Sequence, residues 1–133
     1  MIIIYILNQR MMKIKLILVL TFTFSLLFSN CRRKNCEQLS NNFGTFNEAI
    51  NKIKSTRFRI EEEVNTSRSS WVKWASFYSC DGNYGYFILK TDKEEYLYSG
   101  MPYIIWQQFK DASSFGVFYN EKIKHQYILQ LAK

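Results

Sequence analysis

The feature that most restricts the fold of this chain is an apolar run near its N-terminus. Leu16–Phe28 holds thirteen residues without a charge and follows the short cationic segment Met12–Lys15. A membrane-spanning helix needs about 20 apolar residues, whereas the apolar region of a secretory signal peptide has about 7–15. We therefore expect residues 1–30 to be a signal peptide that is removed on export and takes no part in the fold.

A retained membrane anchor is the alternative for this leader. It would need Met1–Leu7 as a second apolar piece, but Arg10 and two lysines separate that piece from the longer run. A charge in the middle of a membrane span costs about 2.5–3.5 kcal/mol on insertion scales. We therefore favour export, with translation starting at Met11 or Met12.

The end of the leader, Leu27–Cys31, resembles the lipobox of bacterial lipoproteins, in which the cysteine is diacylated and becomes the new N-terminus. The resemblance implies that Cys31 carries lipid and holds the protein at a membrane of the cell envelope. Two acyl chains anchor a protein stably, and the basic residues Arg32–Lys34 would add about 1 kcal/mol each at an anionic surface. Ordinary cleavage with Cys31 left free is the alternative.

The remaining 103 residues are enough for one domain with a modest core. Most of the net charge of +7 lies in the N-terminal part of the chain. The segment Thr66–Ile128 is nearly neutral, with seven Lys or Arg and six Asp or Glu. Binding to a phosphate backbone needs an excess of cations. The charge distribution therefore makes nucleic acid an unlikely partner, and it leaves a protein or a glycan as the expected one.

Two further cysteines, Cys36 and Cys80, are a candidate disulfide in an oxidising compartment. The bond would close a loop of 44 residues and contribute about 4 kcal/mol on the chain-entropy model. Two unpaired thiols remain the alternative, because sequence does not show whether the Cα atoms approach each other. Neither cysteine has the CxxC spacing of a metal or redox site.

Residues 43–65 are expected to add one helix and one strand before the main sheet. Apolar residues at helical spacing predict a helix over 45–55, capped by Thr45 or Asn47. Alternating apolar and charged residues then predict a strand near 58–64. Its three acids, Glu61–Glu63, suggest paired carboxylates for acid–base chemistry, but a solvated strand or turn is the interpretation we favour.

The second half of the chain predicts an α+β fold. Trp71–Tyr78, Tyr84–Thr91 and Glu94–Tyr98 form three strands joined by short turns, which indicates a three-stranded antiparallel meander with the strand near 58–64 as a fourth. Ser99–Pro102 is expected to start a helix, with the proline in its first turn. Trp106 and Phe109 would anchor this helix on the sheet. A second short helix follows, capped by Ser113 or Ser114.

Four motifs lie in order between residues 66 and 128. They are Ser69-Ser70-x-Val72, Tyr96-x-Tyr98, Met101-Pro102 and Ala112-x-Ser114-x-Gly116-x-Phe118-Tyr119-Asn120-x-x-Ile123-Lys124-x-x-Tyr127. Together they resemble the KTSC domain, named after the C-terminus of some lysyl-tRNA synthetases and also found as a stand-alone bacterial domain. The family has no established function, and RNA binding has been suggested from its synthetase context. The resemblance divides the chain into a tether at 31–42, the extension at 43–65 and a KTSC-like domain at 66–128.

Catalytic motifs are not found in the sequence. His125 is the sole histidine and lies among polar residues near the chain end, where a surface histidine is more common than a base or a metal ligand. Ser113 and Ser114 are better explained as helix caps than as nucleophiles. We therefore expect no enzyme activity, no cofactor and no metal.

A set of aromatic residues is the remaining candidate for a binding surface: Tyr96, Tyr98, Trp106, Phe115, Phe118 and Tyr119. These rings could stack on a ligand or join the sheet to its helices. We expect most of them in the core, with the Tyr96 and Tyr98 pair left exposed because two short helices cannot cover both faces of a sheet. The sequence thus predicts a lipid-anchored binding or structural module of the cell envelope, with RNA binding as the alternative.

Overall fold

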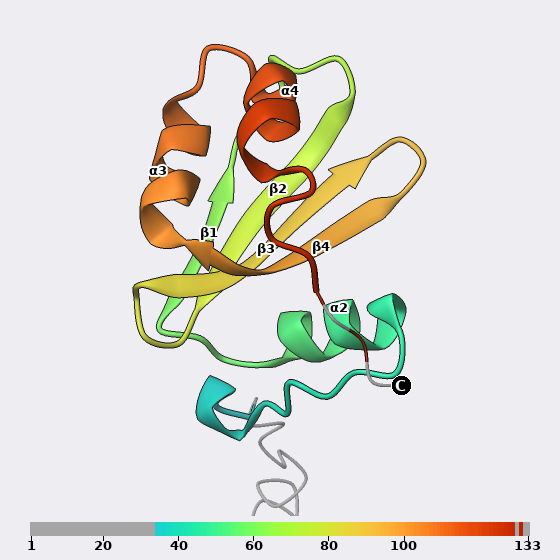
Figure 1. Ribbon diagram of the computed structural model, residues 1–133, viewed down its shortest axis with the longest axis vertical. Helices are drawn as coiled ribbons and strands as arrows, with labels where there is room; N and C mark the ends of the chain where they lie inside the picture. The colour runs from blue at the N-terminus through green and yellow to red at the C-terminus, as the bar shows by residue number, and fades with distance from the viewer. Residues whose placement is uncertain (1–33, 130, 132–133) are drawn as a thin grey trace, which may run out of the picture. The chain divides into compact units, whose positions relative to one another are not determined.

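A computed structural model describes residues 34–129 and 131, which form a four-stranded antiparallel sheet with helices on both faces (Figure 1). The expected signal peptide and the lipidation site Cys31 lie outside these residues. Within the described part, no helix is long and apolar enough to span a membrane. The architecture confirms the expected α+β class.

The sheet is a meander in which each strand pairs with its neighbour in the sequence. Its order is β1 (Ile60–Val64), β2 (Val72–Ser79), β3 (Tyr84–Thr91) and β4 (Glu95–Pro102). The strand expected near 58–64 is therefore the fourth strand of the sheet, paired antiparallel with β2. The three strands of the expected meander are confirmed, the first two with small shifts of their ends and the third with a longer C-terminal end.

Strand β4 is longer than the sequence pattern predicts. It continues through Ser99–Pro102, the segment that we expected to begin a helix, and helix α3 (Tyr103–Asp111) starts only after Pro102. Gly100 has φ of +70° at an irregularity in the β3–β4 register, which lets the strand pass this point without leaving the sheet. The φ that proline imposes suits a strand end as well as a first helical turn. The sequence therefore did not show whether Pro102 ends a strand or begins a helix.

One face of the sheet is covered by α3, α4 (Phe115–Phe118) and the π-helical turn η2 (Tyr119–Ile123). Trp106 and Phe109 of α3 are fully buried, with their rings near those of Phe77 and Phe87 in the sheet. Ser114 caps α4 by accepting a hydrogen bond from the Val117 N–H at 3.4 Å. The expected anchoring of α3 and the cap at Ser114 are both found.

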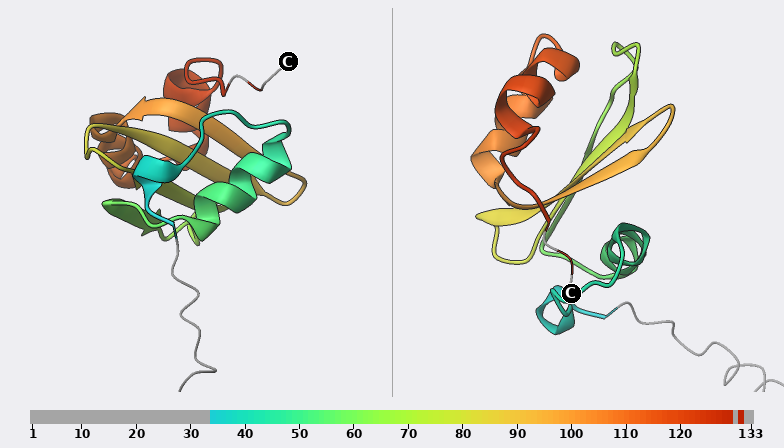
Figure 2. Two further views of the ribbon diagram at one scale, coloured as in Figure 1. Left: turned by 90° about the horizontal axis from the view of Figure 1, so that it is seen from below. Right: turned by 45° about the vertical axis from the view of Figure 1, so that its right-hand side comes forward.

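The opposite face is covered by helix α2 (Phe46–Ser55), as Figure 2 shows. Thr45 is its N-cap and accepts a hydrogen bond from the Glu48 N–H at 3.1 Å. The helix buries Ile50 and Ile53 in a cluster that includes Leu97 of β4. Our expectation that one face would stay uncovered is therefore wrong, because the 43–65 extension supplies the missing layer.

The lead-in before α2 is hydrogen-bonded to the folded unit from Lys34 onward, and the expected lipid-attached tether at 31–42 stays a prediction. The backbone of Lys34 and Cys36 hydrogen-bonds to Arg57 at 2.8 and 2.9 Å, and the short 3₁₀ turn η1 (Cys36–Gln38) follows. Cys36 forms a disulfide with Cys80, with the two Cα atoms 5.8 Å apart. The lead-in is thus fixed to the turn between β2 and β3.

Candidate binding groove

The six aromatic residues singled out from the sequence do not form one exposed surface. Trp106, Phe115, Tyr98 and Tyr119 are buried in the core between sheet and helices, and Tyr96 and Phe118 are partly buried against that core. Tyr96 and Tyr98 are therefore not left exposed as a pair. Tyr98 instead belongs to the core, and Tyr96 lies at its border.

Tyr98 and Tyr119 join β4 to η2 through their hydroxyl groups. The two oxygens are 2.5 Å apart in a buried hydrogen bond, and the rings meet edge to face with centroids 6.0 Å apart. Burial, together with the hydrogen bond, raises the pKa of Tyr98 far above its usual value. The Tyr98 hydroxyl therefore stays protonated, and its hydrogen bond holds Tyr119 of η2 against β4.

A groove of about 430 Å³ opens beside this tyrosine pair, along the first half of β4. The partly buried ring of Tyr96 lies on it, 6.4 Å from the ring of Tyr119 between centroids. Phe46 of α2 and Ile128 of the C-terminal segment also line it, and their side chains are 46% and 64% exposed. Apolar surface of this kind beside convergent polar groups is typical of a binding site.

The groove is lined by charged groups of both signs. Glu94 borders Tyr96, and its negative charge raises the pKa of the tyrosine hydroxyl. Lys124 and His125 line the groove from the segment after η2. His125 is exposed and has φ of +71°, in the left-handed region, where the chain turns back toward β4.

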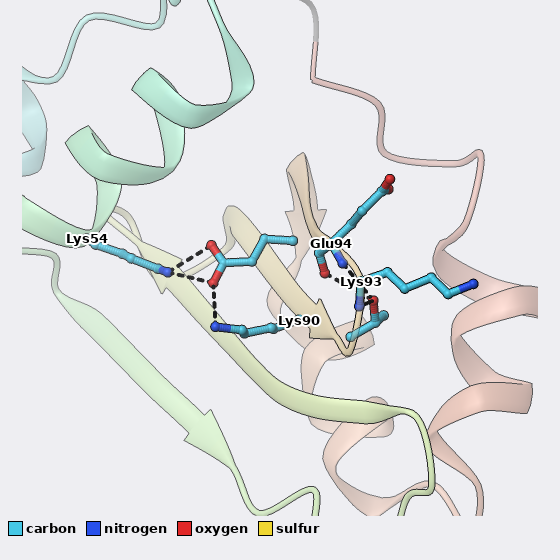
Figure 3. Close-up of polar contacts among 6 residues, drawn as sticks. Lys54, Lys90, Lys93 and Glu94 are labelled. Carbon is cyan, nitrogen blue, oxygen red and sulfur yellow. Dashed lines mark hydrogen bonds and ion pairs between the residues drawn. The ribbon is translucent and has the colours of Figure 1, made fainter.

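The first residue of β4 is held in place by two lysines from different elements. Glu95 accepts hydrogen bonds from Lys54 of α2 at 3.0 and 3.2 Å, and Lys90 of β3 lies 3.7 Å from the same carboxylate. In Figure 3, Lys54 and Lys90 point toward this carboxylate, whereas Lys93 and Glu94 point away from it. The charge of Glu95 is thus neutralised by Lys54 and Lys90. The carboxylate of Glu94 takes no part in this cluster of Glu95 with two lysines.

A second polar cluster was missed by the sequence analysis. Glu62 of β1 accepts hydrogen bonds from the Tyr103 hydroxyl, the Trp106 Nε1–H and Lys110 Nζ, each at 2.7 Å. Burial alone would raise the pKa of this carboxyl, but the three donors outweigh burial and lower it. Glu62 is therefore not the solvated acid that we expected, although its inward place in the alternation of β1 was a signal.

The Glu62 cluster links α3 to β1. Both carboxylate oxygens of Glu62 already accept hydrogen bonds from side chains of α3. A further hollow of about 540 Å³ lies beside Cys80 and is lined in part by Tyr84 and Tyr86. Among residues 34–129 and 131, no group of His, Cys, Asp or Glu is arranged to hold a metal ion. The groove beside β4 is therefore the candidate site that combines exposed apolar side chains with charges that have different signs.

These features define a small α+β domain with a groove at one edge of its sheet. The family model of the KTSC domain matches residues 89–127, which run from β3 through η2. The match confirms the resemblance over this stretch, shorter than the expected 66–128, and it includes Tyr96, Tyr98 and Tyr119. No curated protein and no solved structure matches the chain.

Proposed function

We propose that this protein is a lipid-anchored, non-catalytic binding module of the cell envelope, and that the groove beside β4 is its contact site. The observation that carries the proposal is the exposure of Phe46 and Ile128 around a groove lined by Tyr96. Exposed apolar side chains that gather at a hollow are characteristic of binding surfaces. Part of the groove lining, including Tyr96 and Tyr119, lies on the segment that matches the KTSC domain, whereas Phe46 and Ile128 lie outside it.

The leader and the disulfide support an envelope location. The sequence before Cys31 has the features of a secretory signal peptide that ends in a lipobox. The disulfide between Cys36 and Cys80 agrees with export, because disulfides persist mainly in oxidising compartments. Both features favour the envelope over the cytosol.

The charges around the groove favour a protein or glycan partner over RNA. Glu94 and Lys124 line the groove with opposite charges, and the charge of Glu95 is neutralised by Lys54 and Lys90. Stacking on an exposed ring is worth about 1–3 kcal/mol per base, but non-specific RNA affinity comes mainly from neutralising phosphates. The groove does not offer that excess of positive charge.

The lipid anchor is tested by replacing Cys31 in the full chain. We expect Cys31→Ser to move the protein from the membrane fraction to a soluble or unprocessed form, whereas Cys36→Ser leaves it in the membrane. Mass spectrometry of the wild-type protein should show Cys31 as an acylated N-terminus. A mature N-terminus at another residue, without the mass of acyl chains, would overturn the anchor.

The groove is tested by photo-crosslinking in intact cells. A photoreactive residue at position 96 should capture a discrete envelope partner, and the same residue at the exposed Ile104 of α3 should not. RNA is tested by fluorescence anisotropy of a labelled oligonucleotide with the mature protein over a salt series. Binding at micromolar concentration that Tyr96→Ala abolishes would replace the envelope function with the RNA alternative.

A further inference from the structure

The fold begins very close in the sequence to the proposed lipid anchor. Only Arg32 and Arg33 separate Cys31 from Lys34, whose carbonyl accepts a hydrogen bond from the Arg57 N–H at 2.8 Å. An extended chain spans at most about 3.6 Å per residue, so the Cα atoms of Cys31 and Lys34 lie within about 11 Å of each other. A lipid on Cys31 therefore holds this part of the fold next to the membrane surface.

The first folded residues are joined to one end of the sheet. Asn35 forms a parallel bridge with Arg57, and Cys36 is bonded to Cys80, which follows β2 directly. The turn between β2 and β3 lies at this end, whereas the turn between β3 and β4 lies at the other (Figure 1). The eight residues of β3 separate the two turns by about 20 Å, since a strand rises about 3.3 Å per residue.

The side chains exposed at this end suit a membrane surface. Lys34, Arg57 and Arg59 are exposed, and Phe58 between the two arginines is buried. Tyr84 begins β3 at the same end and has 59% of its surface exposed. Anionic headgroups attract lysine and arginine, and tyrosine is enriched at the level of the headgroups. We call these four exposed residues, Lys34, Arg57, Arg59 and Tyr84, the anchored face.

The turn between β2 and β3 connects parts of the anchored face. The Arg59 guanidinium donates a hydrogen bond to the Asp81 carbonyl at 3.2 Å, and the Asp81 carboxylate accepts one from the Tyr84 N–H at 3.0 Å. Arg57 is linked to the same turn through the lead-in and its disulfide. The arginines and the tyrosine are thus held at one end of the fold by contacts within it.

The charges at this end have a small positive excess. The three cations of the anchored face are matched in number by three acids near them: Glu37 in η1, Glu61, which accepts from the Phe58 N–H, and Asp81. Arg32 and Arg33 add two positive charges beside the anchor, and no acid lies between Cys31 and Cys36. This excess favours anionic lipid, while the acyl chains supply the attachment itself.

We propose that the anchored face lies against the anionic headgroups of the membrane that holds Cys31. The short chain between Cys31 and Lys34 and the cations beside it set this orientation, and Tyr84 lies at the level of the headgroups. The turn between β3 and β4 then points away from the membrane, and Glu94 of the groove is left on the aqueous side. The inference rests on the lipid anchor of the proposed function and adds a second contact site to it.

Paramagnetic lipid tests the orientation in the acylated full protein. The protein is placed in nanodiscs of phosphatidylcholine and phosphatidylglycerol with a trace of lipid whose headgroup chelates gadolinium, and the relaxation of its amides is measured by NMR. The enhancement of relaxation falls steeply with distance from the headgroups. We expect it to be at least about tenfold larger at Gly82 than at Asp92, because the two turns are about 20 Å apart along β3. Equal enhancement at the two turns, or a larger one at Asp92, would overturn the proposal.

Charge reversal tests the contact itself. Arg57→Glu with Arg59→Glu places acids on the anchored face, whereas Lys93→Glu with Lys122→Glu makes the same change of net charge at exposed residues outside it. We expect the first pair to lower the ratio of the enhancements at the two turns at least about threefold, and the control pair to leave it unchanged. Equal ratios for the two pairs would show that the arginines do not contact the headgroups and would overturn the proposal. Should the first pair fail to fold, the ratio in the wild type still decides.

Two outcomes separate this inference from the function on which it rests. If mass spectrometry finds no acyl chain on Cys31, the lipid anchor is overturned together with the orientation, and crosslinking at position 96 still tests the groove. If Cys31 is acylated and the two turns respond equally, the anchor stands and only the contact of the anchored face is overturned.

Discussion

The two faces of the sheet are covered in different ways. The helices α3 and α4 follow β4 directly in the sequence, and they pack aromatic rings such as Trp106 and Phe109 on one face. Helix α2 precedes all four strands and packs aliphatic side chains such as Ile50 and Ile53 on the other, with a disulfide beside it. The first face thus has the larger set of buried rings, whereas the second combines aliphatic side chains with the rings of Phe43, Phe58 and Tyr78 and is supported by a covalent bond.

The largest expected effect is on the aromatic face. Trp106 is fully buried, and its side chain also donates a hydrogen bond to Glu62. We expect Trp106→Ala to lower the free energy of unfolding by about 3–5 kcal/mol, because truncating a buried aromatic leaves a cavity. Urea denaturation of the mature protein measures the change, with the exposed Ile104→Ala as the control within about 0.5 kcal/mol of wild type. A Trp106→Ala protein that melts within a degree or two of wild type would show that this face is not the main core.

The second prediction concerns the face covered by α2 and its disulfide. Replacing both cysteines, Cys36→Ser with Cys80→Ser, should lower the free energy of unfolding by about 2–4 kcal/mol, because the unfolded chain gains the freedom of an open 44-residue loop. Hydrogen exchange should become faster in α2 than in α3. If hydrogen exchange became faster by the same factor in both helices, the two faces would unfold as one unit. The predicted difference in stability between the two faces would then be wrong.

A smaller effect is expected from the buried tyrosine pair on the aromatic face. Tyr98→Phe leaves the Tyr119 hydroxyl without its buried partner, which costs about 1–3 kcal/mol. The double variant Tyr98→Phe with Tyr119→Phe should cost less than the sum of the two single changes, because no hydroxyl is then left unsatisfied. Denaturation of the four proteins gives this coupling. Strictly additive changes would show that the hydrogen bond contributes nothing.

The smallest effect is the pH dependence that Glu62 contributes. Its pKa is lower in the folded protein than its usual value of 4.5, so the stability that it adds is present above that value and is lost as the pH falls through the folded pKa. The ion pair with Lys110 is partly exposed, and we expect less than about 1 kcal/mol from it. Comparing Glu62→Gln with wild type between about pH 6 and pH 3 by thermal denaturation measures the loss. A constant difference across this range would contradict the prediction.

The elements of both faces were largely readable from the sequence. Helical spacing predicted α2 with Thr45 as a cap, and alternation and turn residues predicted the strands, because these signals are local. The end of β4 was missed because Gly100 and Pro102 suit either a bulged strand or a helix start. The covering of the second face was missed because no local signal says on which side of a sheet a preceding helix will pack.

The candidate groove could be predicted only in part. Tyr96 and Tyr119 were named from the sequence, but Phe46 and Ile128 come from segments that are distant in the chain and meet only in the fold. Likewise, the three donors to Glu62 lie more than 40 residues away from it in the sequence. Contacts of this kind depend on how α2 and α3 pack, which residue spacing does not determine.

The disulfide also affects what happens when a protease cuts the protein. Cys36 and Cys80 enclose the exposed residues between β1 and β2, among them Asn65 and Ser67. A single cut in this loop would leave the two pieces covalently joined, so the piece with the groove would remain attached to the piece that follows Cys31. Separation would require reduction of the bond as well as cleavage. A protease that cuts this loop would thus break the backbone without releasing strands β2–β4 from the N-terminal lead-in.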